Sequence, residues 1–320
     1  MKQRYRKQSL ARTACFALAI FLTQTAWAQD TSRLEFLNQQ MAELVRKGDV
    51  NQAIEIAKKS LKIAQDSYGP DHVIVASTMS NLALLYQNQG QYALAEPLYK
   101  SALAIQEKAH GPDHPDLAQI LNNLATLYQA QGQYAQAEPL FKHSLAIREK
   151  APGPNNSDLA NSLNNLALLY QAQSQYAQAE PLFKRSLEIR EKILGPDHPD
   201  LANGLNNLAL LYQSQKQYAQ AEPLFKRSLE IREKALGPDN PELAKSLNNL
   251  ASLYRTEGKF AEAEPLLKRS LAIREKALGP NHPDVVKSLN NLALLYQDEG
   301  QYEQAKALLK RAKEIKEASQ

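Results

Sequence analysis

Cysteine and tryptophan are almost absent from this 320-residue chain, in which Cys15 and Trp27 are the only examples and both lie near its start. Without further cysteines the rest of the chain has no disulfide framework, so its folded state depends on packing alone. The chain also has no phosphate-binding Gly-x-x-x-x-Gly-Lys-Ser/Thr loop, no His-Glu-x-x-His pair and no Gly-x-Ser-x-Gly elbow. These absences predict a protein that is not an enzyme and needs no cofactor.

An excess of basic charge is lacking outside the first dozen residues. The formal net charge is +4, but residues 1–12 hold five Lys or Arg and no acid, which leaves 33 basic against 34 acidic side chains in the remainder. A protein that binds nucleic acid needs a basic surface for the phosphates. We therefore expect no nucleic-acid partner.

The first residues have the three parts of a secretion signal. A basic stretch is followed by an apolar run over 14–22 and then by Ala26-Trp27-Ala28, a small-residue cleavage site. The apolar run has about half of the ~20 residues that span a bilayer. The sequence predicts a signal peptide over 1–28, cleaved between Ala28 and Gln29, an exported protein in the periplasm or outside the cell, and no stable membrane insertion. Retention of the segment as an uncleaved anchor is the alternative.

A repeat with a constant step of 42 residues organises the remaining chain. Asn-Asn-Leu-Ala recurs at this step, beginning at Asn122, Asn164, Asn206, Asn248 and Asn290. We expect a degenerate N-terminal repeat over 29–70, six full repeats over 71–320, and a polar last helix that caps the array.

Each repeat is predicted to contain two amphipathic helices. In the first, Leu163, Leu166 and Tyr170 share one face by their i, i+3, i+7 spacing. In the second, Pro181 is expected near the end of the first turn, where a missing N–H costs little. The tyrosines that recur in both helices are expected in the core. Because neither helix can bury its apolar stripe alone, stacking of neighbours should form the core.

The linker between repeats, Gly195–Asp200, contains helix stop and start signals. The glycine is expected to end one helix in the left-handed conformation, and Pro199 and Asp200 suit the beginning of the next. A histidine recurs in this linker at His72, His114, His198 and His282. Ligands of one ion lie ~2 Å from it, whereas stacked helices are ~10 Å wide. We therefore expect no metal site.

The motif Leu-Asn-Asn-Leu-Ala-Leu-Leu-Tyr, followed by Gly-x-Tyr-x-x-Ala-Glu-Pro-Leu, resembles the tetratricopeptide repeat. The 42-residue period and the Gly-Pro-Asp-His-Pro-Asp linker resemble its kinesin light chain subtype, since the ordinary period is 34. The resemblance implies an all-α fold, a right-handed α-solenoid of about seven helix-turn-helix repeats. Ser174 and Lys216 depart from the pattern by replacing the turn glycine.

The resemblance also implies a concave groove, lined by the first helices, that holds extended peptides. Carboxamides offer two donors and two acceptor lone pairs, which complement a peptide backbone. The predicted groove contacts are the paired asparagines Asn122, Asn123, Asn164, Asn165, Asn206, Asn207, Asn248, Asn249, Asn290 and Asn291. Apolar groove contacts are expected from Leu84, Leu168, Leu210 and Leu294. The alternative is that one asparagine of each pair bonds the neighbouring repeat and only stabilises the stack.

Three cations, Lys245, Arg255 and Lys287, would make the C-terminal half of that groove more positive, which favours an acidic ligand. The alternative for these residues is ordinary solvated charge. By contrast, Glu-before-Lys pairs such as Glu180–Lys184 should form an exposed outer face.

The sequence therefore predicts a non-catalytic scaffold that binds a peptide or protein segment in its concave groove. Two alternatives remain at this point: a self-assembling structural protein, and an adaptor that uses convex residues such as Lys184 and Arg185. The oligomeric state is left open.

Overall fold

The computed structural model describes residues 30–150 and 157–318, and every regular element in those two ranges is an α-helix. The predicted signal peptide and its cleavage site between Ala28 and Gln29 lie outside the described residues. The chain divides into two compact units, Met1–Ala151 and Pro152–Gln320, and each is described by itself.

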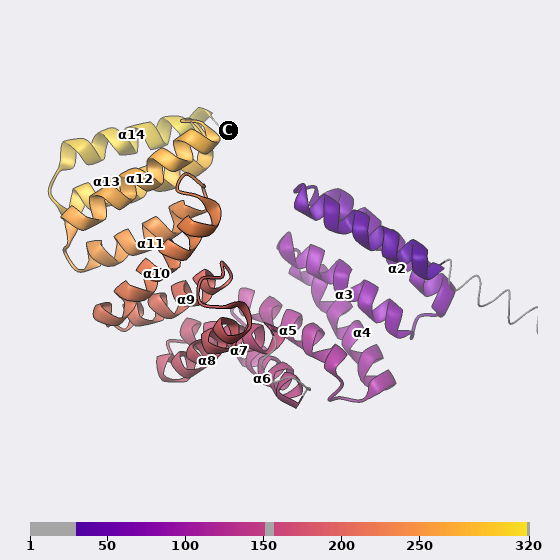
Figure 1. Cartoon of the computed structure of the whole chain (residues 1–320). Helices are drawn as coiled ribbons and strands as arrows, with labels where there is room; N and C mark the ends of the chain where they lie inside the picture. The colour runs from indigo at the N-terminus through magenta and orange to yellow at the C-terminus, as the bar shows by residue number, and fades with distance from the viewer. Residues whose placement is uncertain (1–29, 151–156, 319–320) are drawn as a thin grey trace, which may run out of the picture. The chain divides into compact units, whose positions relative to one another are not determined.

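The first unit contains a helix over 30–46, then α2 (Val50–Tyr68), α3 (Val73–Asn88), α4 (Tyr92–His110), α5 (Pro115–Ala130) and α6 (Tyr134–Lys150). The second unit contains α7 (Ser157–Ala172), α8 (Tyr176–Leu194), α9 (Leu201–Ser214), α10 (Tyr218–Leu236), α11 (Leu243–Thr256), α12 (Phe260–Leu278), α13 (Pro283–Asp298) and α14 (Tyr302–Ala318). Figure 1 shows the helices of the second unit stacked in chain order.

Within each unit the helices form helix-turn-helix pairs. The odd-numbered helices, called first helices here, each pack against the even-numbered second helix that follows, and that second helix packs against the next first helix. The described ranges contain seven pairs: the helix over 30–46 with α2, and the six pairs from α3–α4 to α13–α14. This arrangement confirms the predicted all-α solenoid of about seven repeats.

The core lies between the helices at the positions that the repeat predicts. Leu163, Leu166 and Tyr170 are buried on α7, and Phe183 packs from α8 at 2% exposure. Burying a leucine or phenylalanine side chain contributes about 1.5–3 kcal/mol. The pairs α5–α6, α9–α10 and α11–α12 repeat this arrangement, so the core continues from one pair to the next within each unit.

The tyrosines only partly follow the prediction. Those of the first helices, such as Tyr212, are buried, except for the partly buried Tyr86. Those that begin the second helices, such as Tyr176 and Tyr218, are half-buried, and Tyr302 is 69% exposed. The prediction that both sets belong to the core is therefore wrong for the second set. These residues lie at helix starts, where one side of the ring faces solvent.

The phenols of four buried tyrosines on first helices join two repeats. Tyr212 Oη on α9 donates to Glu180 Oε1 on α8 at 3.0 Å, and the same carboxylate receives Lys184 Nζ at 2.7 Å. The hydrogen bond from Lys184 holds the pKa of Glu180 below its ordinary value. Equivalent tyrosine–glutamate bonds link Tyr128 to Glu96, Tyr254 to Glu222 and Tyr296 to Glu264. The predicted Glu–Lys pairs are present, but their glutamates also hold neighbouring repeats together.

Linker histidines begin several first helices, a role that the sequence analysis missed. His198 Nδ1 accepts the backbone N–H of Asp200 at 3.2 Å, and the other histidines at this position do the same for α3, α5 and α13. Asn240 replaces the histidine before α11 and accepts through Oδ1 at 2.9 Å. The signal was available, because asparagine is a preferred residue before a helix and shares this linker position.

Two local expectations need correction. Gly195 has the expected positive φ of 86°, but its ψ of 163° is more extended than the left-handed helical conformation. Pro181 lies in the second turn of α8, which begins at Tyr176, so the proline removes a helical hydrogen bond to Ala177. Ser174 and Lys216 adopt φ of 59° and 60°, so both keep the backbone of the glycine they replace.

Candidate functional site

The ten predicted asparagines all lie on first helices and none is freely exposed. Asn122 and Asn206 are buried, at 7% and 5% exposure, and the other eight are partly buried. Their carboxamides therefore lie at or just beneath the surface.

An asparagine ladder links neighbouring first helices in the second unit. Asn207 Nδ2 on α9 donates to Asn164 Oδ1 on α7 at 3.0 Å, and Asn249 Nδ2 on α11 donates to Asn206 Oδ1 on α9 at 2.6 Å. The first asparagine of one pair thus accepts from the second asparagine of the next. For these residues the stack-stabilising alternative applies, because the bonded atoms are already used between repeats.

The ladder changes at the next junction. Asn248 Oδ1 on α11 is buried and has no hydrogen-bond partner in the described part of the chain. Beside it lies a pocket of about 250 Å³ between α11, α12 and α13. We call the α9–α11 contact the closed junction and the α11–α13 contact the open junction. The residues around the pocket are Asn248, Asn249, Ala251, Ser252, Arg255, Leu267, Asn291 and Leu294.

Three departures from the repeat surround this pocket. Leu267 occupies the position of Phe225, Ser252 that of Leu210, and Arg255 that of Gln213. Two of these changes replace a larger apolar side chain by a smaller one, which leaves space between helices that otherwise pack fully. Sequence reasoning identified Arg255 but missed Ser252 and Leu267. Comparing each repeat position along the chain would have found them.

The three predicted groove cations lie apart. Arg255 lines the pocket, where its Nε lies 3.4 Å from Asp298 Oδ2. Lys287 Nζ lies 3.1 Å from Asp284 Oδ1, and this contact lowers the pKa of Asp284. Lys245 is exposed. Two of the three charges are therefore paired within the chain, which reduces the positive potential expected there.

The carboxamides one turn before the paired asparagines are used within their own repeats. Arg190 Nη2 donates to Asn161 Oδ1 at 2.6 Å, and Arg232 Nη2 donates to Asn203 Oδ1 at 2.5 Å. Burial lowers the pKa of both arginines. Lys245 occupies the same position on α11 and cannot accept from Arg274. Arg274 keeps the bond from Nη1 to Ser288 Oγ, at 2.8 Å, which matches the bond from Arg232 Nη1 to Ser246 Oγ. This row of residues therefore anchors second helices.

The predicted apolar groove contacts remain accessible. Leu84 and Leu294 are 40% and 43% exposed, and Leu168 and Leu210 are partly buried. At the open junction Leu294 and the carboxamides of Asn248 and Asn291 share one pocket. This pocket therefore combines apolar surface, an acceptor and a guanidinium.

Neither a candidate metal cluster nor a candidate membrane-spanning helix is found in the described residues. Across 30–150 and 157–318, no three His, Cys, Asp or Glu side chains are grouped so that they could hold a metal ion. Within the same ranges, no helix is both long enough and apolar enough to cross a bilayer.

The sequence and structure resemble known proteins over most of the chain. A solved structure of nearly identical TPR-like repeats of a Podosopora anserina kinesin light chain is 31% identical, covers 65% of this chain and 98% of its own, and has a TM-score of 0.59. BtubC (BKLC) from P. vanneervenii is 24% identical over 72% of this chain and 91% of its own, with a TM-score of 0.61.

The apo form of the quorum sensor NprR from B. thuringiensis shares the fold, with a TM-score of 0.67, 15% identity and coverage of 89% of this chain and 77% of its own. No curated protein matches the chain. The tetratricopeptide repeat model matches residues 36–108, 74–150, 158–234, 200–276 and 242–318. Because these matches span most of its length, the chain belongs to the tetratricopeptide repeat family.

Proposed function

We propose that this protein is a non-catalytic scaffold that binds a peptide segment of a partner protein across its first helices, with the open-junction pocket as the principal contact. The observation that carries the proposal is the unpaired Asn248 Oδ1 beside a pocket of about 250 Å³. A peptide N–H would satisfy this acceptor, and leaving a buried acceptor unmade costs about 1–3 kcal/mol.

The lining of the pocket indicates the kind of segment it suits. Leu294 is 43% exposed and offers an apolar contact, and Arg255 offers a guanidinium that can exchange Asp298 for a carboxylate of the ligand. The segment should therefore carry an apolar side chain next to an acidic one. Membership in a family whose repeats mediate protein interactions supports a peptide or protein ligand.

A phage-displayed library of random ten-residue peptides is the probe for this proposal, selected on the full chain and then on variants. Leu267→Phe restores the residue found at Phe225 and should fill the pocket, weakening the selected peptides by at least about tenfold. Leu278→Phe is the matched control, because Leu278 lies on the same helix and is 40% exposed. Equal binding by the Leu267→Phe and control variants would contradict the pocket as the principal contact.

Asn248→Ala and Arg255→Gln then separate the two polar contacts. Asn248→Ala should weaken all selected peptides, whereas Arg255→Gln should weaken only the acidic ones, by about three- to tenfold. Alanine at Asn164 or Asn206 is less informative, because these residues bond neighbouring repeats.

Export is part of the same proposal, supported by the signal-like residues 1–28. Mature protein recovered outside the cytoplasm should begin at Gln29 by N-terminal sequencing. Recovery of the unprocessed chain from the cytoplasm alone would contradict it.

A further inference from the structure

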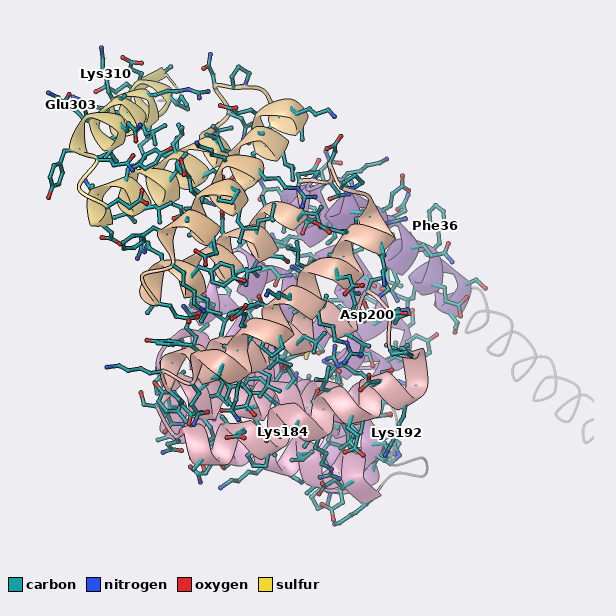
Figure 2. All side chains as sticks on the ribbon, turned by 60° about the vertical axis from the view of Figure 1, so that its left-hand side comes forward. Phe36, Lys184, Lys192, Asp200, Glu303 and Lys310 are labelled. Carbon is teal, nitrogen blue, oxygen red and sulfur yellow. The ribbon has the colours of Figure 1, made fainter. Side chains whose placement is uncertain are left out.

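The last helix pair leaves a second pocket open. It has a volume of about 380 Å³, and six of its lining residues lie along α14: Tyr302, Ala305, Lys306, Leu309, Lys310 and Lys313. Leu309 is 39% exposed. Figure 2 shows Lys310 on α14 at the end of the second unit.

The same surface is covered in the preceding repeats. Leu309 occupies the position of Phe183, Phe225 and Leu267, which are 2%, 1% and 3% exposed. In each of those repeats the next first helix packs against the second helix. The pocket on α14 is therefore the place that a further helix would occupy.

Two contacts at the α8–α9 junction fix how such a helix lies. Tyr212 Oη donates to Glu180 at 3.0 Å, and a Cβ added at Gly204 would lie 3.4 Å from Leu187 Cδ1. Gly204 and Tyr212 are eight residues apart on α9, with Leu208 between them at 4% exposure. An incoming helix thus places residues i, i+4 and i+8 toward the second helix.

The charge of this surface changes in the last repeat. Lys306 replaces the glutamate found at Glu180, and Lys313 replaces the leucine found at Leu187, with Lys310 between them. Lys306 forms no ion pair within the described residues. Lys310 and Lys313 pair with Glu314 and Glu317 of the same helix, at 3.9 and 3.6 Å. Three lysines therefore border an apolar strip that retains the shape for a helix.

We propose that this surface docks an acidic amphipathic helix of a partner protein. In the register of the internal repeats, an acidic residue at i lies opposite Lys313, an apolar residue at i+4 covers Leu309, and an acidic residue at i+8 lies opposite Lys306. The proposal concerns a different surface from the open-junction pocket and does not depend on it.

A second copy of this chain fits the surface less well. The residues of the N-terminal helix that match i, i+4 and i+8 are Phe36, Gln40 and Leu44. None of the three is acidic, so head-to-tail stacking in the internal register would bring no carboxylate from these positions to Lys306 or Lys313. Charge complementarity therefore favours an acidic partner helix over self-association.

The test uses the full chain and a fluorescein-labelled, lactam-stapled 20-residue helix with the pattern Glu-x-x-x-Leu-x-x-x-Glu. Fluorescence anisotropy at about 0.15 M salt, where exposed charges are screened beyond ~8 Å, should show saturable binding. Lys306→Glu with Lys313→Glu should weaken it by at least about tenfold. A peptide with lysines in place of both glutamates should recover binding to this double variant.

Lys59→Glu with Lys62→Glu is the charge-matched control on the exposed side of α2, and helicity of both variants is checked by circular dichroism. Equal binding by a scrambled peptide of the same composition would overturn the proposal, since charge alone would then explain the affinity. An equal loss of binding in the Lys59→Glu, Lys62→Glu control variant would also overturn the proposal. Concentration-dependent oligomers of the native chain that disappear in the Lys306→Glu, Lys313→Glu variant would assign the surface to a second copy instead.

Discussion

The closed and open junctions of the second unit are built from nearly the same residues. They differ because the open junction has a pocket and a buried acceptor without a partner in the described residues. At the closed junction Asn249 Nδ2 donates to Asn206 Oδ1 at 2.6 Å, and Phe225 is 1% exposed. At the open junction Asn248 Oδ1 has no partner, and Leu267 lines a pocket of about 250 Å³. The Asn-Asn-Leu-Ala motif is identical in both.

The contact that joins the repeats elsewhere is nevertheless the same at both junctions. Tyr254 Oη reaches Glu222 at 3.0 Å, and Tyr296 Oη reaches Glu264 at 2.8 Å. The opening is therefore local, confined to the side where the asparagines meet. In this array, the stacking contacts and the proposed binding pocket involve different residues, so substitutions should separate them.

Alanine substitution at the core position that distinguishes the junctions should give the largest difference in the free energy of unfolding. Phe225→Ala should lower the free energy of unfolding by about 3–5 kcal/mol, and Leu267→Ala by about 2–3 kcal/mol, because the second cavity merges with an existing pocket. Equilibrium urea unfolding, analysed as coupled repeats, measures both. Equal losses would mean that the two junctions are packed equally well.

Alanine substitutions of the two asparagines should differ by less in the free energy of unfolding, and the substitution at the closed junction should again cost more. Asn206→Ala removes an acceptor from Asn249 and should cost about 1–2 kcal/mol, whereas Asn248→Ala removes an unpaired acceptor and should change the free energy of unfolding by less than about 0.5 kcal/mol. The same urea titrations test this pair. A loss at Asn248 as large as at Asn206 would indicate that Asn248 is bonded in solution.

Substitutions in the turns before α10 and α12 should change the stability by a smaller amount, and the two changes should have opposite signs. Lys216 has φ of 60°, and Gly258 at the matching position has φ of 74°. Lys216→Gly should stabilise the chain by about 1 kcal/mol, since a side chain in this conformation is strained. Gly258→Lys should destabilise it similarly. Thermal melts of both variants measure these changes. An unchanged melting temperature in both variants would show that a side chain at this backbone conformation has no energetic cost.

The repeat period predicts the fold well, because the spacing of Leu163, Leu166 and Tyr170 defines a buried face without reference to any partner. It does not predict hydrogen-bond partners. Asn164 and Asn248 are the same residue at the same position, yet only Asn164 accepts from the next repeat. That difference depends on how Leu267 and Ser252 pack around the carboxamides. Packing is determined by side-chain volumes, which the repeat period does not specify.

The smallest expected effect is a pH dependence shared by the two junctions. The hydrogen bond from Lys226 holds the pKa of Glu222 below its ordinary value, and Lys268 does the same for the pKa of Glu264. A carboxyl whose pKa is lower in the folded chain contributes stability above its unfolded pKa and loses it as the pH falls through the folded pKa. Because the lysines are exposed and solvent screens their charge, we expect each pair to contribute only a small part of the stability.

Glu222→Gln and Glu264→Gln should therefore lower stability slightly at pH 7 and reduce its decline below about pH 4.5. Urea midpoints at pH 7 and in the acid range measure both. Lys259 Nζ also lies 3.6 Å from Glu222 Oε2, and Gln301 replaces it at the open junction, so the two substitutions are compared in the Lys259→Gln background, where their effects should be equal. A clearly smaller effect for Glu264→Gln would show that the opening extends from the asparagines to the contact at Tyr296, and that stacking and binding are coupled at this junction.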